Sequence, residues 1–252
     1  MDGMLSERQS KLLDFIIKEF VKTAKPVASE LIAKKGDFDV SPATIRNDMF
    51  ELEKMGYLDQ LHTSGGRVPT DKAYRQFVDK LKERELEPLS DEKRKIKSVI
   101  NSTENPYELN KRIARTLSGL CDAAVIAKIL DSSTSDSDFY KIGLSSLFEF
   151  PEFRELDRIF EVANLFDKFE SIFAQIERHL LSRFDNEFQV LIGEENPLES
   201  IQNESMILAK YYLPGDLRGS LTIIGPMRMD YEKNISLVKY TTDELNKLSE
   251  RL

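Results

Sequence analysis

The sequence predicts an α+β protein with two domains. Apolar residues recur at helical spacing in three short segments before residue 60, and a glycine-tipped hairpin pattern follows them directly. After residue 90, strand-like runs with an internal hairpin are flanked by helical patterns, which is typical of an α+β domain. These observations place a small helical domain with a hairpin at residues 1–82 and a larger α+β domain at residues 90–252.

The first domain begins with two helical patterns. Ser6 is a suitable N-cap for the first helix. The apolar face of that helix carries Leu12, Leu13, Ile16, Ile17, Phe20 and Val21. Lys25-Pro26 ends it, because proline cannot continue a helix. A second short helix is expected from about Ala28, and the turn Gly36–Asp39 leads out of it.

The segment Val40–Thr70 is the most informative part of the chain. Ser41 is a good N-cap, and Pro42 occupies the first helical position, where its missing N–H costs nothing. An apolar stripe follows at helical spacing, at Ile45, Met49 and Leu52. Gly56 is placed to end this third helix in a left-handed conformation.

A hairpin pattern comes directly after the third helix. It runs through Tyr57–Leu61, turns at Thr63–Gly66 and returns over Arg67–Pro69. The Gly-Gly pair in the turn tolerates the positive φ angles that tight hairpins need. A further helix is expected over Asp71–Leu81. Three helices followed by a hairpin predict a winged helix-turn-helix, a fold that binds double-stranded DNA.

The polar face of the third helix predicts the contacts to DNA. Arg46 can pair with a phosphate or with guanine O6 and N7, and Asn47 can read adenine. The alternative for Asn47 is a solvated helix position, and the alternative for Arg46 is an ion pair with Glu51 or Glu53. The same face carries Thr44 and Ser41, although Ser41 is also structural as the cap.

The hairpin and the start of the next helix supply further candidates. Arg67 follows the wing tip and is the best candidate for a minor-groove or phosphate contact. His62 is a weaker candidate, and Lys72 and Arg75 are expected as phosphate anchors or as solvated charges. The predicted DNA-binding residues are Ser41, Pro42, Thr44, Arg46, Asn47, His62, Thr63, Ser64, Gly65, Gly66, Arg67, Thr70, Lys72 and Arg75.

The charge distribution constrains this interpretation. Residues 1–80 contain 13 Lys+Arg and 13 Asp+Glu, so the DNA-binding region has no net positive charge. Residues 81–252 contain 23 Lys+Arg and 31 Asp+Glu, a net charge of −8. DNA-binding domains usually carry a basic surface. Most phosphate contacts must therefore come from a few cations, and the acidic second domain is expected to stand away from DNA and to serve regulation or dimerisation.

The second domain follows a boundary at residues 83–91. Helices are predicted at 91–102, 107–120, 152–166, 168–183 and 231–252. Strands are predicted at 123–130, 187–192, 205–213 and 220–224, the last two joined by a turn at Pro214-Gly215-Asp216. The run Asp131–Asp138 consists of Asp, Ser and Thr and is predicted to be a polar loop.

Catalysis has no support in the sequence. His62 and His179 are far apart and the chain has one cysteine, Cys121, so no metal-ligand spacing exists and no internal disulfide can form. Gly143 and Gly193 are isolated, and there is no nucleophile elbow or phosphate-binding loop. No apolar run approaches the length of a membrane span, and no signal-peptide pattern begins the chain. We expect a cytoplasmic protein without enzymatic activity, cofactor or metal.

Several blocks of the sequence resemble the HrcA family of heat-inducible transcription repressors. They are LSERQ (5–9), PVAS (26–29), VSPATIRNDM (40–49), LEKMGYL (52–58), HTSGGRVPTDKAYRQFVD (62–79), GLSSLFEFPEF (143–153), IGEEN (192–196) and IGPMRMDY (224–231). The blocks are long and lie in both domains. The resemblance implies a winged-helix domain followed by a GAF-like domain that carries an inserted dimerising segment. It also implies a homodimer that binds the CIRCE inverted repeat upstream of chaperone operons, is released on heat stress, and has the GroE chaperonin as a partner.

The chain departs from that family in one large respect. In the family, a strand pair and the inserted domain would lie between the strand at 123–130 and the block at 143–153. Here the Asp/Ser loop and a few residues fill the gap. The sequence is therefore expected to be a shortened relative without the dimerising insert, in which the DNA-reading blocks remain complete.

Two other functions are consistent with the same residues. In the first, the GAF-like domain senses a small molecule in a pocket lined by the strands at 205–213 and 220–224. In the second, the chain is a protein-interaction module that has lost operator binding together with its insert.

Overall fold

The computed structural model describes residues 5–60, 66–131, 137–154, 188–197 and 199–250, together with 156, 158–164, 167, 168 and 170. The chain divides into two compact units, Met1–Arg84 and Glu85–Leu252. The tip of the predicted hairpin (61–65), the centre of the Asp/Ser run (132–136) and most of the predicted helix at 168–183 lie outside the described residues.

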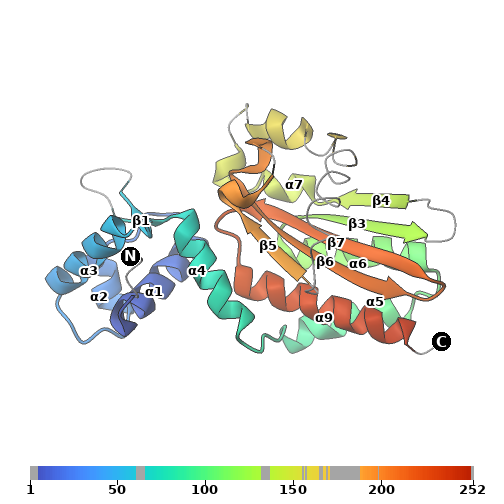
Figure 1. The fold of residues 1–252 in the computed structure, drawn as a ribbon, viewed down its shortest axis with the longest axis horizontal. Helices are drawn as coiled ribbons and strands as arrows, with labels where there is room; N and C mark the ends of the chain where they lie inside the picture. Colours follow the sequence, from blue (N-terminus) through green and yellow to red (C-terminus); the bar gives the residue numbers. More distant parts are fainter. Residues whose placement is uncertain are drawn as a thin grey trace. The chain divides into compact units, whose positions relative to one another are not determined.

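The first unit contains the predicted helices (Figure 1). They are α1 (Glu7–Thr23), α2 (Ser29–Lys35), α3 (Pro42–Lys54) and α4 (Asp71–Lys82). Ser6 caps α1 as predicted, since its side chain accepts from Gln9 N and the Gln9 side chain accepts from Ser6 N. Ala24 ends α1 in the left-handed conformation, one residue before Lys25-Pro26. Side chains from all four helices form one apolar core, with Leu13, Ile16, Ile32, Ile45, Leu52 and Val78 among its members.

A small hairpin completes the first unit. Strand β1 (Leu58–Asp59) pairs antiparallel with β2 (Val68–Pro69). An isolated bridge between Val27 and Arg67 adds the connection between α1 and α2 to the edge of β2. Its two backbone hydrogen bonds, N to O in each direction, are both 2.9 Å long. Helices α1–α3 with this hairpin confirm the predicted winged helix-turn-helix.

The second unit is built on an antiparallel sheet. Among the described residues its strands are β3 (Ala124–Asp131), β4 (Ser137–Ile142), β5 (Phe188–Ile192), β6 (Glu204–Leu213) and β7 (Leu217–Pro226). They lie in the order β4-β3-β7-β6-β5, with every neighbouring pair antiparallel. Left-handed Gly215 and Asp216 form the tight turn between β6 and β7, where the sequence predicted it. The predicted α+β class is confirmed.

Helices cover both faces of this sheet because its strands are apolar on both sides. Helices α6 (Pro106–Cys121) and α9 (Tyr231–Ser249) pack on one face, and α5 (Ser90–Asn101) packs against both of them (Figure 1). Short helix α7 (Leu144–Leu147) and the 3-10 turn Pro151–Phe153 cover the opposite face. Their apolar contacts there include Leu147, Phe153, Val162, Ile126, Met206 and Ile224.

Two predictions for the second unit differ from the structure at their bounds. The Asp/Ser run is not a loop from end to end, because Asp131 ends β3 and Ser137 begins β4, with Leu130 paired to Ser137. Strand β4 lies at the edge of the sheet, where polar side chains can remain solvated. Its polar first residues therefore lack the apolar pattern from which a strand is predicted. The helix predicted from Glu152 starts later, because a 3-10 turn ends at Phe153, but residues 156 and 158–164 are helical as predicted.

A buried ion pair attaches the covering segment to the end of β6. Arg158 Nη2 donates to Oε1 of Glu204, whose side chain is 1% exposed. Burial of this carboxylate raises the pKa of Glu204 to about 7, although the nearby Arg158 charge lowers it. Burial therefore raises the pKa by more than the ion pair lowers it, because one guanidinium does not compensate for the water that the buried carboxylate has lost.

We predict that replacing Gly143 with alanine destabilises the second unit. Gly143 has φ +84°, and an added Cβ would overlap Ser118 Oγ and lie 2.5 Å from the Ala123 carbonyl oxygen. Strain and overpacking together should lower the free energy of unfolding by roughly 2 kcal/mol or more. The matched control is Gly119→Ala, where nothing lies within 4 Å of the new Cβ. Calorimetry should show a lower melting temperature for Gly143→Ala only; equal melting temperatures would contradict this account.

We also predict a pH dependence that originates at Glu204. Its folded pKa of about 7 exceeds the ordinary value of 4.5, so between these values the folded state keeps a proton that the unfolded state has lost. Stability should therefore fall as the pH rises through this window, by at most about 1.4 kcal/mol per pH unit. Denaturant unfolding of wild type and Glu204→Gln should differ less at pH 5, where folded Glu204 is neutral like glutamine, than at pH 8, where wild type buries a charge and the variant is the more stable. Glu199→Gln, at an exposed site, should show no such trend.

Candidate nucleic-acid interface

The N-terminal half of α3 presents the predicted DNA-reading residues on one exposed face. Ser41, Pro42, Arg46 and Asn47 are exposed, and Thr44 is half-buried. Ser41 caps the helix as predicted: its Oγ accepts from Thr44 N at 3.2 Å and lies 3.1 Å from Thr44 Oγ1. The exposed first turn therefore combines backbone N–H groups with two hydroxyls, a combination that can bind phosphate.

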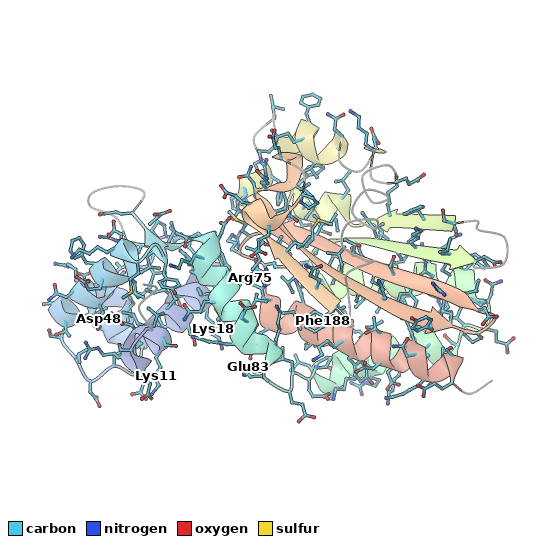
Figure 2. All side chains as sticks on the ribbon, viewed as in Figure 1. Lys11, Lys18, Asp48, Arg75, Glu83 and Phe188 are labelled. Atoms are coloured by element: carbon cyan, nitrogen blue, oxygen red, sulfur yellow. The ribbon has the colours of Figure 1, made fainter. Side chains whose placement is uncertain are left out.

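The inner side of α3 is fixed to the rest of the unit. The predicted stripe is buried, at Ile45, Met49 and Leu52. Asp48 adds an anchor that the sequence analysis missed: its carboxylate accepts from Arg8 Nε at 2.7 Å and from Arg8 Nη2 at 2.9 Å. Asp48 lies on α3 in Figure 2 and is 9% exposed. Its position beside the apolar stripe was the available signal that it faces inward.

Arg46 has a different partner from the one expected. Its Nη2 lies 2.6 Å from Glu30 Oε1 and 3.4 Å from Ser29 Oγ, both on α2. The alternative pairing with Glu51 or Glu53 was wrong. Glu51 instead accepts from Lys54 Nζ at 3.0 Å, and Glu53 accepts from Arg67.

Arg67 occupies the base of the wing. Its Nε donates to Glu53 Oε2 at 2.8 Å, and its side chain is 15% exposed. Its backbone pairs with Val27. In this structure the guanidinium therefore joins β2 to α3, and does not project as a free wing cation.

Gly66 is required for close approach and not for its φ angle. Gly66 is absent from the described glycines with positive φ, and Gly65, the other glycine of the predicted turn, lies outside the described residues. A Cβ at this position would overlap the carbonyl group of Val27 and lie 2.7 Å from Val27 N. Of the remaining predicted wing residues, His62, Thr63, Ser64 and Gly65 lie outside the described residues.

The three candidates around α4 connect that helix to its surroundings. Thr70 caps α4, because its Oγ1 accepts from Ala73 N, and the same hydroxyl donates to Gly56 O at 2.7 Å. Lys72 donates to Met55 O at 3.0 Å and lies over the Tyr57 ring. Arg75, labelled on α4 in Figure 2, lies 3.4 Å from Asp79. Thr70 and Lys72 thus hold the start of α4 against the end of α3, and Gly56 has the predicted positive φ.

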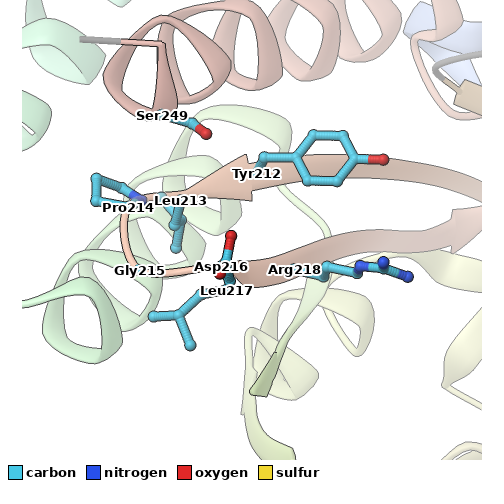
Figure 3. A pocket seen from close by; sticks show the side chains of 8 residues that line it. All are labelled: Tyr212, Leu213, Pro214, Gly215, Asp216, Leu217, Arg218 and Ser249. Carbon is cyan, nitrogen blue, oxygen red and sulfur yellow. The ribbon is translucent and has the colours of Figure 1, made fainter. Parts of the chain in front are cut away.

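The second unit has an open cavity at the turn between β6 and β7. It measures about 520 Å³ and is lined by Tyr212–Arg218 and Ser249 (Figure 3). A neighbouring cavity of about 390 Å³ shares Leu213 and Pro214. The predicted strands contribute through their ends at the turn, because their central residues are buried in the packed core. Within the described residues no group of His, Cys, Asp and Glu could hold a metal ion. Nor does any described helix have the length and hydropathy to cross a membrane.

Comparison with known proteins gives matches over both units. A family model described as "Winged helix-turn-helix transcription repressor, HrcA DNA-binding" matches residues 4–83. A second, "HrcA protein C terminal domain", matches residues 67–235. The chain is 26% identical over 343 residues to the heat-inducible transcription repressor HrcA of Desulforudis audaxviator, covering 98% of this chain and 99% of that protein. It is 28% identical to that of Thermoanaerobacter pseudethanolicus, covering 97% of each.

A solved structure shares the fold. The crystal structure of a hypothetical protein superposes with a TM-score of 0.77 at 18% identity, covering 99% of this chain and 100% of that one. The alignment with the Desulforudis protein spans 343 positions, whereas this chain has 252 residues. At least 91 positions of that alignment (343 less 252) therefore have no counterpart here, which agrees with the prediction of a shortened chain.

We predict that Arg67 and Arg46 respond differently to truncation. Arg67→Ala should lower the free energy of unfolding of the first unit by roughly 1–2 kcal/mol, because it leaves half-buried Glu53 unpaired. Arg46→Ala removes an ion pair whose side chains are 67% and 65% exposed, and pairs of this kind contribute little. Thermal unfolding of the two variants measures the difference. An Arg46→Ala variant less stable than Arg67→Ala would refute the assignment of Arg67 to the frame and Arg46 to the surface.

Proposed function

This chain belongs to the HrcA family of heat-inducible transcription repressors, and on that premise we propose that it represses chaperone genes by binding the CIRCE inverted repeat. The family is one of transcription repressors and not of enzymes. The observation that carries the proposal is the exposed polar face at the start of α3, within a winged helix-turn-helix. That face holds Ser41, Arg46 and Asn47, and the opposite face is buried.

The first turn of α3 enters the major groove in the proposed complex. Arg46 pairs with guanine O6 and N7, and Asn47 pairs with adenine N6 and N7. Backbone N–H groups and the hydroxyls of Ser41 and Thr44 bind phosphates at the helix N-terminus, where the helix dipole favours negative charge. Arg67 and Lys72 act indirectly, because their hydrogen bonds hold the wing and α4 against α3.

An inverted repeat is read by two copies related by two-fold symmetry, so we propose a homodimer on the operator. In this homodimer the acidic second units of the two copies contact each other, away from the DNA phosphates. Heat releases the repressor when partial unfolding of this unit removes the dimer that can bind both half-sites. We further propose that the protein acts in the cytoplasm and that a GroE-type chaperonin helps to restore its folded state.

A second candidate function is regulation by a small molecule. The observation that favours it is the cavity at the β6–β7 turn, where Tyr212, Asp216, Arg218 and Ser249 supply polar groups around an opening large enough for a metabolite. Here ligand binding, in place of temperature, would set operator affinity. A thermal-shift screen of metabolites, with Arg218→Ala as the comparison, separates the two candidates.

We predict specific binding to the inverted repeat. In a gel-shift assay, wild type should bind a CIRCE duplex at least a hundredfold more tightly than a scrambled duplex of equal length. The ratio of specific to non-specific affinity is typically about 10³–10⁷ for sequence-specific DNA-binding proteins, so a hundredfold is a conservative threshold. Arg46→Ala should bind the operator weakly and retain the affinity of wild type for scrambled DNA within a few fold. Equal binding of wild type to both duplexes would contradict the proposal.

Light scattering with and without operator provides the companion measurement. Two protein copies per duplex support reading of an inverted repeat, and one copy per duplex contradicts it. A duplex carrying a single half-site is the control, because it should recruit one copy.

A further inference from the structure

The Arg46 side chain is held by α2 on the surface that α3 exposes. Its Nη2 lies 2.6 Å from Glu30 Oε1 and 3.4 Å from Ser29 Oγ. The Arg46 and Glu30 side chains are 67% and 65% exposed. A carboxylate on this surface repels the phosphates of an approaching duplex. Its presence beside the main candidate for base recognition therefore needs a reason.

Stability does not supply that reason, because an exposed ion pair of this kind contributes little to folding. Glu30 also carries its charge at neutral pH. Its pKa lies below the ordinary value because its own backbone N–H donates to the carboxylate, with further contributions from Ser29 and Arg46. The two glutamates of α3 itself have different neighbours. Glu51 pairs with Lys54, one turn along α3, and Glu53 pairs with Arg67 inside the wing base.

We propose that Glu30 is a positioning residue for base recognition, holding the Arg46 guanidinium so that its outer edge meets a guanine. This inference rests on the proposed function. The guanidinium is planar and has five N–H donors, and both of its hydrogen bonds within the described residues use Nη2. The other three donors, two on Nη1 and one on Nε, remain for guanine O6 and N7.

The pairing favours base reading over phosphate binding for two reasons. A guanidinium held before binding loses less side-chain freedom when it contacts a base, so the contact is stronger. The adjacent carboxylate also nearly cancels the charge of Arg46, which weakens its attraction to any phosphate. The repulsion between Glu30 and phosphate weakens binding to every duplex, whereas the contact between Arg46 and guanine strengthens binding only to the sequence that carries this guanine. Discrimination between sequences therefore rises.

The experiment compares Glu30→Gln with wild type on a panel of duplexes. The panel contains the CIRCE operator, one variant for each base pair of a half-site changed symmetrically in both halves, and a scrambled duplex. Glu30→Gln keeps the size of the side chain and removes its charge. The matched control is Glu7→Gln on α1, which removes the same charge from an exposed glutamate paired to Lys11 at 2.6 Å. Melting temperatures of all variants establish that they are folded.

In Glu30→Gln we expect discrimination at one G·C pair to fall by about 5–10-fold, within the range that a bidentate contact provides. Affinity for the scrambled duplex should rise, because a negative charge has been removed. Arg46→Ala should lose discrimination at the same base pair, and adding Glu30→Gln to it should cause no further loss, since the two residues act as one unit. Glu7→Gln should keep the wild-type profile at every position.

Unchanged discrimination at every base pair in folded Glu30→Gln would overturn the inference, and so would an equal loss at all positions. If wild type does not distinguish the operator from scrambled DNA, the proposed function fails and this inference falls with it. If wild type distinguishes the operator from scrambled DNA and Glu30→Gln discriminates as well as wild type at every base pair, only the role of Glu30 is rejected.

Discussion

The DNA-binding unit depends on the way α3 is fixed along its inner side. Three apolar residues of this helix are buried at helical spacing, and the carboxylate of Asp48 receives two hydrogen bonds from Arg8 on α1. Apolar burial alone would permit some rotation of the helix about its axis, because it is non-directional. The bidentate pair is directional and sets the angle at which the outer face emerges. The exposed positions of Arg46 and Asn47 follow from that constraint.

A second set of contacts makes the wing an extension of the same frame. The backbone of Arg67 pairs with Val27, and its side chain reaches Glu53 on α3. Gly66 permits this close approach because a side chain there would occupy the space of the Val27 carbonyl group. The first unit thus uses several cations internally while its total charge is balanced. Recognition in such a domain relies on the placement of a few groups more than on long-range attraction to phosphate.

The second unit combines a well-packed sheet with ionisable groups that burial disfavours. Strands β3, β6 and β7 bury both faces, and polar contacts attach the covering segment at the sheet end. Glu204 is nearly inaccessible and pairs with a single arginine, so its ionised form is costly near neutral pH. Local weak points of this kind allow part of a domain to open before the whole unfolds. Such behaviour fits the release on heating that we propose for this unit.

The sequence by itself determined the helices of the first unit, their caps and the winged-helix order, because Ser6, Ser41, Pro42 and Gly56 act on their immediate neighbours. It likewise determined most strands of the second unit through their apolar runs. The tertiary structure decided the partners of the charged residues. Arg46 pairs with Glu30, 16 positions away, Arg8 with Asp48, 40 positions away, and Arg67 turns inward to Glu53. Local spacing cannot reveal these pairings, since they arise only when separate helices pack together. Strand β4 was not predicted for a related reason. Its first residues are polar and have no strand pattern of their own, and they are extended because they pair with β3.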